Sequence, residues 1–109
     1  MRAAILVVGV TVIVSALGLA ACERPKPQTH TVTIGNFRFQ PETVTVARGD
    51  TIVWINKDLV PHTATSKSGG FDSEVIQPEK SWRVTVRKQG DFAYVCTLHP
   101  TMTAMLRVK

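Results

Sequence analysis

The residues with the clearest chemical potential lie close together near the C-terminus. Cys96, His99 and Met102 stand at C-x2-H-x2-M spacing and offer a thiolate, an imidazole and a thioether. We expect this segment to begin where a strand gives way to a loop, so that all three side chains turn toward one point. His62 adds a second imidazole far upstream. Two histidines, a cysteine and a weakly bound methionine are the ligands of trigonal blue-copper sites, so the set predicts one copper ion that cycles between Cu(I) and Cu(II).

Each residue also has an ordinary structural interpretation. A histidine that follows Pro61 is more often a turn residue, a lone methionine more often fills a core, and a lone Cys96 is more often a small buried hydrophobe. The four together favour a metal site, whereas His30 is expected to have no functional role.

An enzyme with Cys96 as nucleophile and His62 or His99 as base lacks an evident orienting acid, so we expect no catalysis. Zinc has little use for a thioether, and a binuclear copper site needs a second cysteine in the loop.

Short β-strands are the elements expected to position these residues. Polar and apolar side chains alternate, with turn residues between the runs, which is the period of strands with one buried face. The predicted strands cover 31–34, 43–46, 51–55, 82–87, 92–96 and 105–108. Outside the N-terminal segment there is no convincing helical period. The pattern predicts an all-β, Greek-key β-sandwich, preceded by an N-terminal signal or lipid-anchor segment.

The first residues have the pattern of an export signal. Met1 and Arg2 precede an uncharged apolar run over 3–21. Leu19-Ala20-Ala21-Cys22 resembles the bacterial lipobox, which implies lipidation of Cys22 as the mature N-terminus. An uncleaved anchor helix is the alternative, because the run nearly spans a bilayer. We therefore expect a lipoprotein signal peptide over 1–21, a polar tether over 22–28 and one domain over 29–109, located in the periplasm.

Charge and cysteine content narrow the choice of partners. The chain has 13 basic and 8 acidic residues, for a formal net charge of +5. Basic residues are scattered and not interleaved with aromatic ones, so nucleic acid is not an expected partner, and only a mild preference for acidic partners or anionic membranes remains.

If Cys22 carries lipid, Cys96 is the single thiol of an exported protein. It is then buried and inert or bound to metal, and otherwise it is tied to Cys22.

The sequence resembles the cupredoxins, most closely the amicyanin and plastocyanin group, over about 29–109. The motifs are Trp54-Ile55-Asn56-Lys57-Asp58 leading to Pro61-His62, and the segment Tyr94-Val95-Cys96-Thr97-Leu98-His99-Pro100-Thr101-Met102. The resemblance implies copper bound by both histidine rings and the cysteine thiolate, with the thioether as axial ligand. It also implies a monomeric electron carrier that is not an enzyme.

Four further residues carry expectations from this resemblance. Met102 is expected to be the axial ligand, whereas Met105 packs in the sandwich. Thr63 stands where the family usually has an asparagine that ties the two ligand loops together, so the brace is either weaker or made by a hydroxyl. Tyr94 matches a position whose hydroxyl braces a loop.

The resemblance finally implies a docking surface around the C-terminal histidine. Its residues are Leu59, Val60, Pro61, Leu98, His99 and Pro100. The expected partners are redox proteins, a donor dehydrogenase or a cytochrome-like acceptor, together with the membrane through the lipid at Cys22. Two alternatives stay open. In the first, the protein is a copper-binding module for buffering or delivery. In the second, the residues of the expected docking surface only close the end of the sandwich.

Overall fold

The computed structural model describes residues 3–6, 8–13 and 26–109. Within these residues the chain forms β-strands and no helix. The strands are β1 (Thr29–Gly35), β2 (Arg38–Gln40), β3 (Thr43–Val46), β4 (Thr51–Asn56), β5 (Thr65–Ser66), β6 (Phe71–Asp72), β7 (Ser81–Thr85), β8 (Gly90–Cys96) and β9 (His99–Val108). The predicted all-β sandwich is confirmed.

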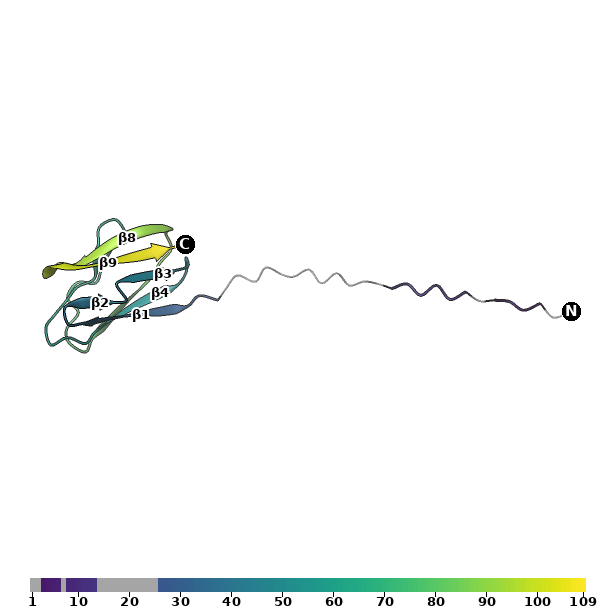
Figure 1. Cartoon of the computed structure of the whole chain (residues 1–109), viewed down its shortest axis with the longest axis horizontal. Coiled ribbons are helices and arrows are strands. Elements are labelled where there is room, and N and C mark those ends of the chain that lie inside the picture. The colour runs from purple at the N-terminus through teal and green to yellow at the C-terminus, as the bar shows by residue number, and fades with distance from the viewer. Residues whose placement is uncertain (1–2, 7, 14–25) are drawn as a thin grey trace.

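Two sheets face each other (Figure 1). One has the strand order β2-β1-β4-β7, and the other has the order β3-β9-β8-β5-β6. The pairs β1/β4 and β3/β9 are parallel, and the remaining pairs are antiparallel. The turn between β8 and β9 lies at one end of the sandwich, and the C-terminus lies at the other (Figure 1).

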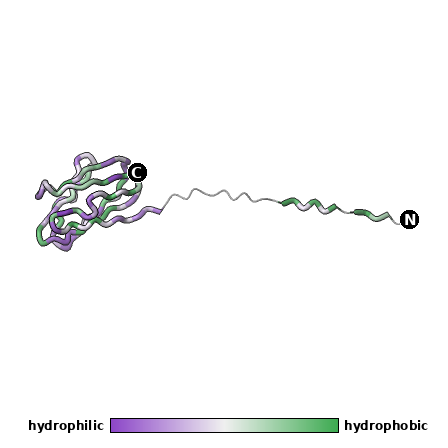
Figure 2. The backbone as a smooth tube through the Cα atoms, in the orientation of Figure 1, coloured by the Kyte–Doolittle hydropathy of each residue, from purple (hydrophilic) through white to green (hydrophobic). Residues whose placement is uncertain are grey.

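The core lies between the sheets, because alternate side chains of each strand point inward. In β4 the inward residues are Ile52, Trp54 and Asn56, and all three are fully buried. Trp54 packs edge to face against Tyr94 of the opposite sheet, with ring centroids 5.6 Å apart. In Figure 2, hydrophobic and hydrophilic segments are mixed throughout the sandwich. The alternation that predicted the strands therefore also defines the buried face.

Tyr94 does not have the predicted bracing role. Its hydroxyl and the indole N–H of Trp54 are both buried, and neither has a hydrogen-bond partner among the residues that the structure describes. Burial raises the pKa of Tyr94 to about 12. The ring of Tyr94 thus contributes to the core through packing, and its hydroxyl braces no loop in the described part of the chain.

The last strand begins earlier than predicted. β9 starts at His99, so only Thr97 and Leu98 separate it from β8. The phase of β9 points Met102, Ala104 and the following alternate residues inward. Met105 lies between two of them and is only partly buried, so the expectation that it packs inside the sandwich is wrong.

The predicted N-terminal features fall mostly outside the described residues. Residues 3–6 and 8–13 are exposed and hydrophobic and form neither helix nor strand (Figure 2). In the described ranges, no helix has the length and hydrophobicity needed to cross a membrane. The lipidation site at Cys22 and the predicted cleavage boundary lie outside those ranges, and the tether is described only over 26–28.

Candidate metal centre

Cys96 is the last residue of β8 and is fully buried. The register between β8 and β9 shifts between Val95 and Cys96, as in a β-bulge, which re-aims side chains beside functional sites. After the shift, Cys96 is paired with His99 across the turn. The Nδ1 atom of His99 consequently lies 3.6 Å from Cys96 Sγ.

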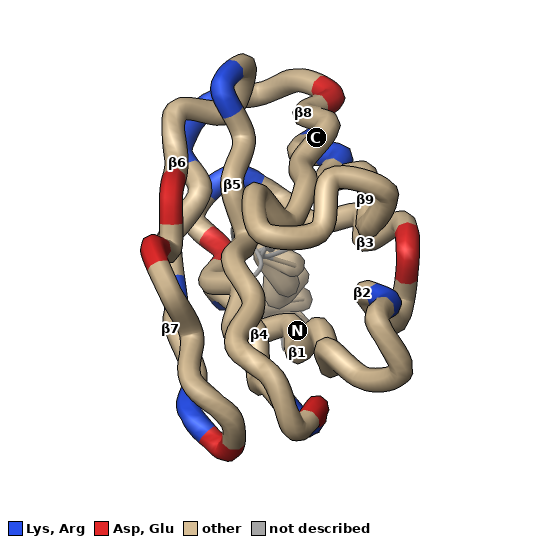
Figure 3. The backbone as a smooth tube through the Cα atoms, turned by 90° about the vertical axis from the view of Figure 1, so that its left-hand side faces the viewer, with Lys and Arg blue, Asp and Glu red and all other residues tan. Residues whose placement is uncertain are grey.

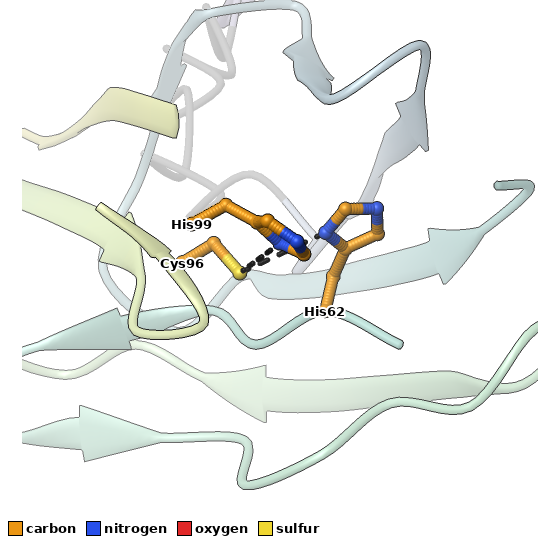
Figure 4. Close-up of side chains that lie close together, drawn as sticks. All are labelled: His62, Cys96 and His99. Carbon is orange, nitrogen blue, oxygen red and sulfur yellow. Dashed lines mark hydrogen bonds between the residues drawn. The ribbon is translucent and has the colours of Figure 1, made fainter. Parts of the chain in front are cut away.

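His62 reaches the same sulfur from the loop between β4 and β5. Its backbone forms a bridge with Ile76, in which the N–H of His62 donates at 3.2 Å and its carbonyl accepts at 2.7 Å. The side chain of His62 is fully buried, and its Nδ1 lies 3.7 Å from Cys96 Sγ. Figure 4 shows both imidazoles directed toward the sulfur.

These three side chains fit a metal ion. Their ligand atoms all lie within 4.8 Å of one another. One thiolate and two imidazoles form the donor set of trigonal blue-copper sites, so Cys96, His62 and His99 are the residues that would hold a copper ion here. The donor set and its spacing therefore suit the predicted group.

Met102 lies three residues after His99 on β9, with its side chain buried on the inward face. It also lines a surface depression together with Phe37 and Phe39. The structure thus brings three of the four predicted ligands together and places the fourth on the same strand as His99. The axial role of Met102 stays a prediction.

Asp58 orients the ring of His62, and the sequence did not single it out as a site residue. Its Oδ2 lies 2.7 Å from His62 Nε2. Burial of the Asp58 carboxyl acts to raise its pKa, but hydrogen bonds from the Phe37 N–H, the His62 ring and the Asn36 N–H outweigh burial, and the pKa lies below the ordinary value. An ionised carboxylate only accepts hydrogen bonds. His62 Nε2 therefore donates to Asp58, and Nδ1 is the ring nitrogen that faces Cys96, as in histidines held by a carboxylate beside a metal.

Asn56 shapes the loop that carries Asp58 and His62. Its fully buried amide donates to the carbonyls of Val60 and Ile76, each at 2.9 Å. Its Oδ1 accepts the backbone N–H of Asp58 at 2.9 Å, which is an Asx turn. The Asn-x-Asp pattern in the sequence is the signal from which this turn could have been predicted.

Thr63 joins the two segments that carry the candidate ligands. Its hydroxyl accepts the backbone N–H of Thr97 at 2.8 Å and lies 3.0 Å from the Thr97 hydroxyl. Its backbone N–H donates to Cys96 Sγ at 3.3 Å. The expected brace exists, and of the two alternatives it is the one made by a hydroxyl.

The predicted docking residues around His99 differ in their exposure to solvent. Leu59 is 95% exposed and Leu98 is 50% exposed, whereas Val60, Pro61 and His99 are partly buried and Pro100 is exposed. The sequence did not point to Phe37, which is 50% exposed and packs against both histidine rings. No local pattern marks Phe37, because its contacts are far away in the sequence.

Comparisons with known proteins identify the family of the chain. The family model for the cupredoxin-like domain matches residues 4–108. Amicyanin-alpha of Methylorubrum extorquens is 28% identical over 112 residues, covering 98% of this chain and 94% of that protein. Amicyanin of Paracoccus versutus is 28% identical over 83 residues, covering 72% of this chain and 63% of the relative, so the match spans less than two thirds of that protein.

Solved structures show the same fold. A reduced amicyanin variant superposes with a TM-score of 0.68 at 25% identity, covering 74% of this chain and 82% of that one. A copper-containing nitrite reductase from Thermus scotoductus gives a TM-score of 0.69 at 24% identity, covering 79% of this chain and 23% of the enzyme, which is a likeness of fold alone. On the family match, the sandwich and the converging donors together, the chain belongs to the cupredoxin-like domain family.

Proposed function

We propose that the protein carries single electrons between redox proteins through one copper ion held by His62, Cys96, His99 and Met102. The observation that carries this proposal is the convergence of two imidazole nitrogens on one buried sulfur at nearly equal distances, 3.6 and 3.7 Å. Copper bound there would supply one-electron chemistry. The resemblance to amicyanins supports the same assignment.

The protein's own residues account for fast electron transfer in three ways. The thiolate favours the reduced ion, and the imidazoles accept both oxidation states. The hydrogen bonds that fix His62 and Cys96 hold the donors in place before the ion binds, so little needs to rearrange when its charge changes. Burial of Cys96 and His62 keeps water from the sulfur.

The end of the sandwich around His99 is the proposed docking surface. Leu59 and Leu98 expose apolar area beside the partly exposed His99. In Figure 3, which views this end, Lys, Arg, Asp and Glu lie mainly toward the edge. An apolar patch with a polar rim is typical of protein-docking sites, so a donor dehydrogenase or a cytochrome-like acceptor is the proposed partner.

Copper titration of the full chain tests the assignment. We expect one equivalent of Cu(II) to produce an intense sulfur-to-copper charge-transfer band in the visible range. Cys96→Ser should abolish the band while preserving the β-sheet circular dichroism. A coloured Cys96→Ser protein, or a colourless wild type loaded with copper, contradicts the site. Slow electron self-exchange with much tighter binding of Cu(I) than of Cu(II) would favour copper delivery instead.

Export and lipid anchoring belong to the same proposal. The signal over 1–21, the tether over 22–28 and the domain over 29–109 would place the copper domain in the periplasm, attached through lipid on Cys22. The apolar run and the lipobox-like sequence support this arrangement. Mass spectrometry of the membrane fraction should find a lipid on Cys22, and Cys22→Ser should release the protein from it. An unmodified Cys22 in a membrane-bound, uncleaved chain would favour the anchor helix.

A further inference from the structure

One carboxylate, that of Asp58, holds two separate parts of the site. Its Oδ1 accepts the backbone N–H of Asn36 at 2.7 Å, and its Oδ2 accepts the backbone N–H of Phe37 at 2.9 Å. The same Oδ2 bonds the ring of His62 at 2.7 Å. Asp58 therefore links the turn between β1 and β2 to the loop between β4 and β5 that carries His62, called the histidine loop below.

This turn has an unusual backbone conformation for its residue types. Asn36 and Phe37 have φ angles of 51° and 56°, in the left-handed region. Such values are uncommon for residues other than glycine, especially for a bulky side chain such as phenylalanine. The two hydrogen bonds to Asp58 compensate for this conformation, because each satisfies a backbone N–H that the turn itself leaves unpaired.

The turn places the Phe37 ring over both candidate histidines. Its centroid lies 5.4 Å from that of His62 and 5.0 Å from that of His99, with both interplanar angles at 88°. These are edge-to-face contacts, a favoured geometry for aromatic pairs. The two imidazoles each approach Cys96 Sγ, so a ring that packs against both lies beside the candidate metal centre.

We propose that Phe37 shields the metal-binding sulfur and positions both histidines, and that Asp58 is the residue that holds Phe37 and His62 in register. The use of this arrangement rests on the proposed function, but the contacts that form it are made by protein groups alone. It acts in the metal-free protein, where it limits access of solutes to Cys96 and keeps Nδ1 of His62 directed at the sulfur.

Thiol reactivity of the metal-free protein tests the shield. The full chain with Cys22→Ser leaves Cys96 as its single thiol, since the sequence has two cysteines. The rate constant for alkylation of Cys96 by iodoacetamide is measured in wild-type background, Phe37→Ala and Phe37→Leu. Loss of two edge-to-face contacts should raise the rate about tenfold in Phe37→Ala, with a smaller rise in Phe37→Leu. Val75→Ala, also 50% exposed, is the matched control and should leave the rate unchanged.

Asp58→Asn tests the link between the β1–β2 turn and the histidine loop. It should raise the alkylation rate as Phe37→Ala does, and the double variant should react no faster than Phe37→Ala alone, because both changes remove the same shield. Nitrogen-15 NMR of the His62 ring in the metal-free protein should show the Nε2–H tautomer in wild type and in Phe37→Ala, and a mixture of tautomers in Asp58→Asn. A purely structural role of Asp58 would leave that tautomer unchanged.

The outcomes separate this inference from the proposed function. A wild-type alkylation rate in folded Phe37→Leu and Phe37→Ala overturns the shield, and additive rates in the double variant overturn the role of Asp58. If Phe37→Ala loses its fold, the rate in Phe37→Leu decides. Failure of the wild type to bind copper would contradict the proposed function while leaving these metal-free results as they are.

Discussion

The hydroxyl of Thr63 accepts the backbone N–H of Thr97 at 2.8 Å and so ties the histidine loop to the turn after β8. Thr63 is buried, and the Thr65 hydroxyl also donates to it at 3.1 Å. Thr63→Val keeps the shape of the side chain but removes the acceptor of the Thr97 N–H, whereas the Thr65 hydroxyl keeps Asp72 Oδ1 as an acceptor at 3.0 Å. We expect the free energy of unfolding of the metal-free protein to fall by about 1–3 kcal/mol, measured by denaturant titration. Thr63→Ser, which retains the hydroxyl, should lose much less, and equal losses in both variants would contradict a hydrogen-bonding role.

The two methionines of β9 should separate packing from copper chemistry. Met102→Leu conserves volume in the core, so the loss of stability in the metal-free protein should stay below about 1.5 kcal/mol. If Met102 is the axial ligand, the same variant should change the visible spectrum and the reduction potential of the copper-loaded protein. Met105→Leu is the matched control on the partly exposed face and should change neither. A spectral change confined to Met105→Leu would assign the ligand to Met105.

Tyr94 should make the protein sensitive to alkali. Its pKa is about 12 in the folded protein and 10.0 ordinarily, so the unfolded chain ionises first as the pH rises. The contribution of the protonated Tyr94 to the free energy of unfolding is fully present below pH 10. It is lost as the pH rises to about 12, a decline of about 3 kcal/mol for this one group. Tyr94→Phe should remove that part of the decline, as measured by denaturant titrations from pH 8 to 11. At neutral pH this variant should be as stable as the wild type or more stable, because the hydroxyl has no hydrogen bond in the described structure. A decline as steep as in the wild type would contradict the assignment.

Asp50 should make the protein sensitive to acid. Its carboxylate accepts the backbone N–H groups of Gln28 and Ala47 and pairs with the ring of His30. These bonds, the one from Gln28 first, lower the pKa of Asp50 from 3.8 to about 2. The stabilisation is therefore present above pH 3.8 and is lost as the pH falls toward 2. Asp50→Asn should be less stable than the wild type near neutral pH, and the difference should shrink between pH 4 and 2 in thermal unfolding curves. A difference that does not depend on pH would contradict this role.

Local alternation was enough to predict most of the sandwich. The strand over 43–46 matches β3 residue for residue, and the strand over 51–55 lacks only Asn56 of β4. The N-terminal part of β9 was missed because His99-Pro100-Thr101 has no alternating hydrophobic pattern. That part is paired with β8, which no local pattern of β9 reveals. The error for Met105 has the same origin, because Leu106 and Val108 set the inward phase and leave Met105 facing outward.

The site was predictable where residue type alone specifies chemistry. His62, Cys96 and His99 converge as expected, since few other roles suit this combination in a β protein. Phe37 was missed because its contacts with both histidines join distant segments and depend on a left-handed backbone angle. Asp58 contacts His62 four residues away, but its bonds to Asn36 and Phe37 join segments about twenty residues apart. Sequence periodicity carries no information about such contacts.

The position of β9 between β3 and β8 has a consequence for how the protein matures. β3 is synthesised early, yet its hydrogen-bonded neighbour in the sheet is the strand synthesised last. The five-stranded sheet therefore cannot close until β9 has been synthesised. Cys96 and His99 flank the β8–β9 turn, so the sulfur does not reach its buried position until β9 has paired. The final strand thus completes the sheet and protects the thiol in a single late step.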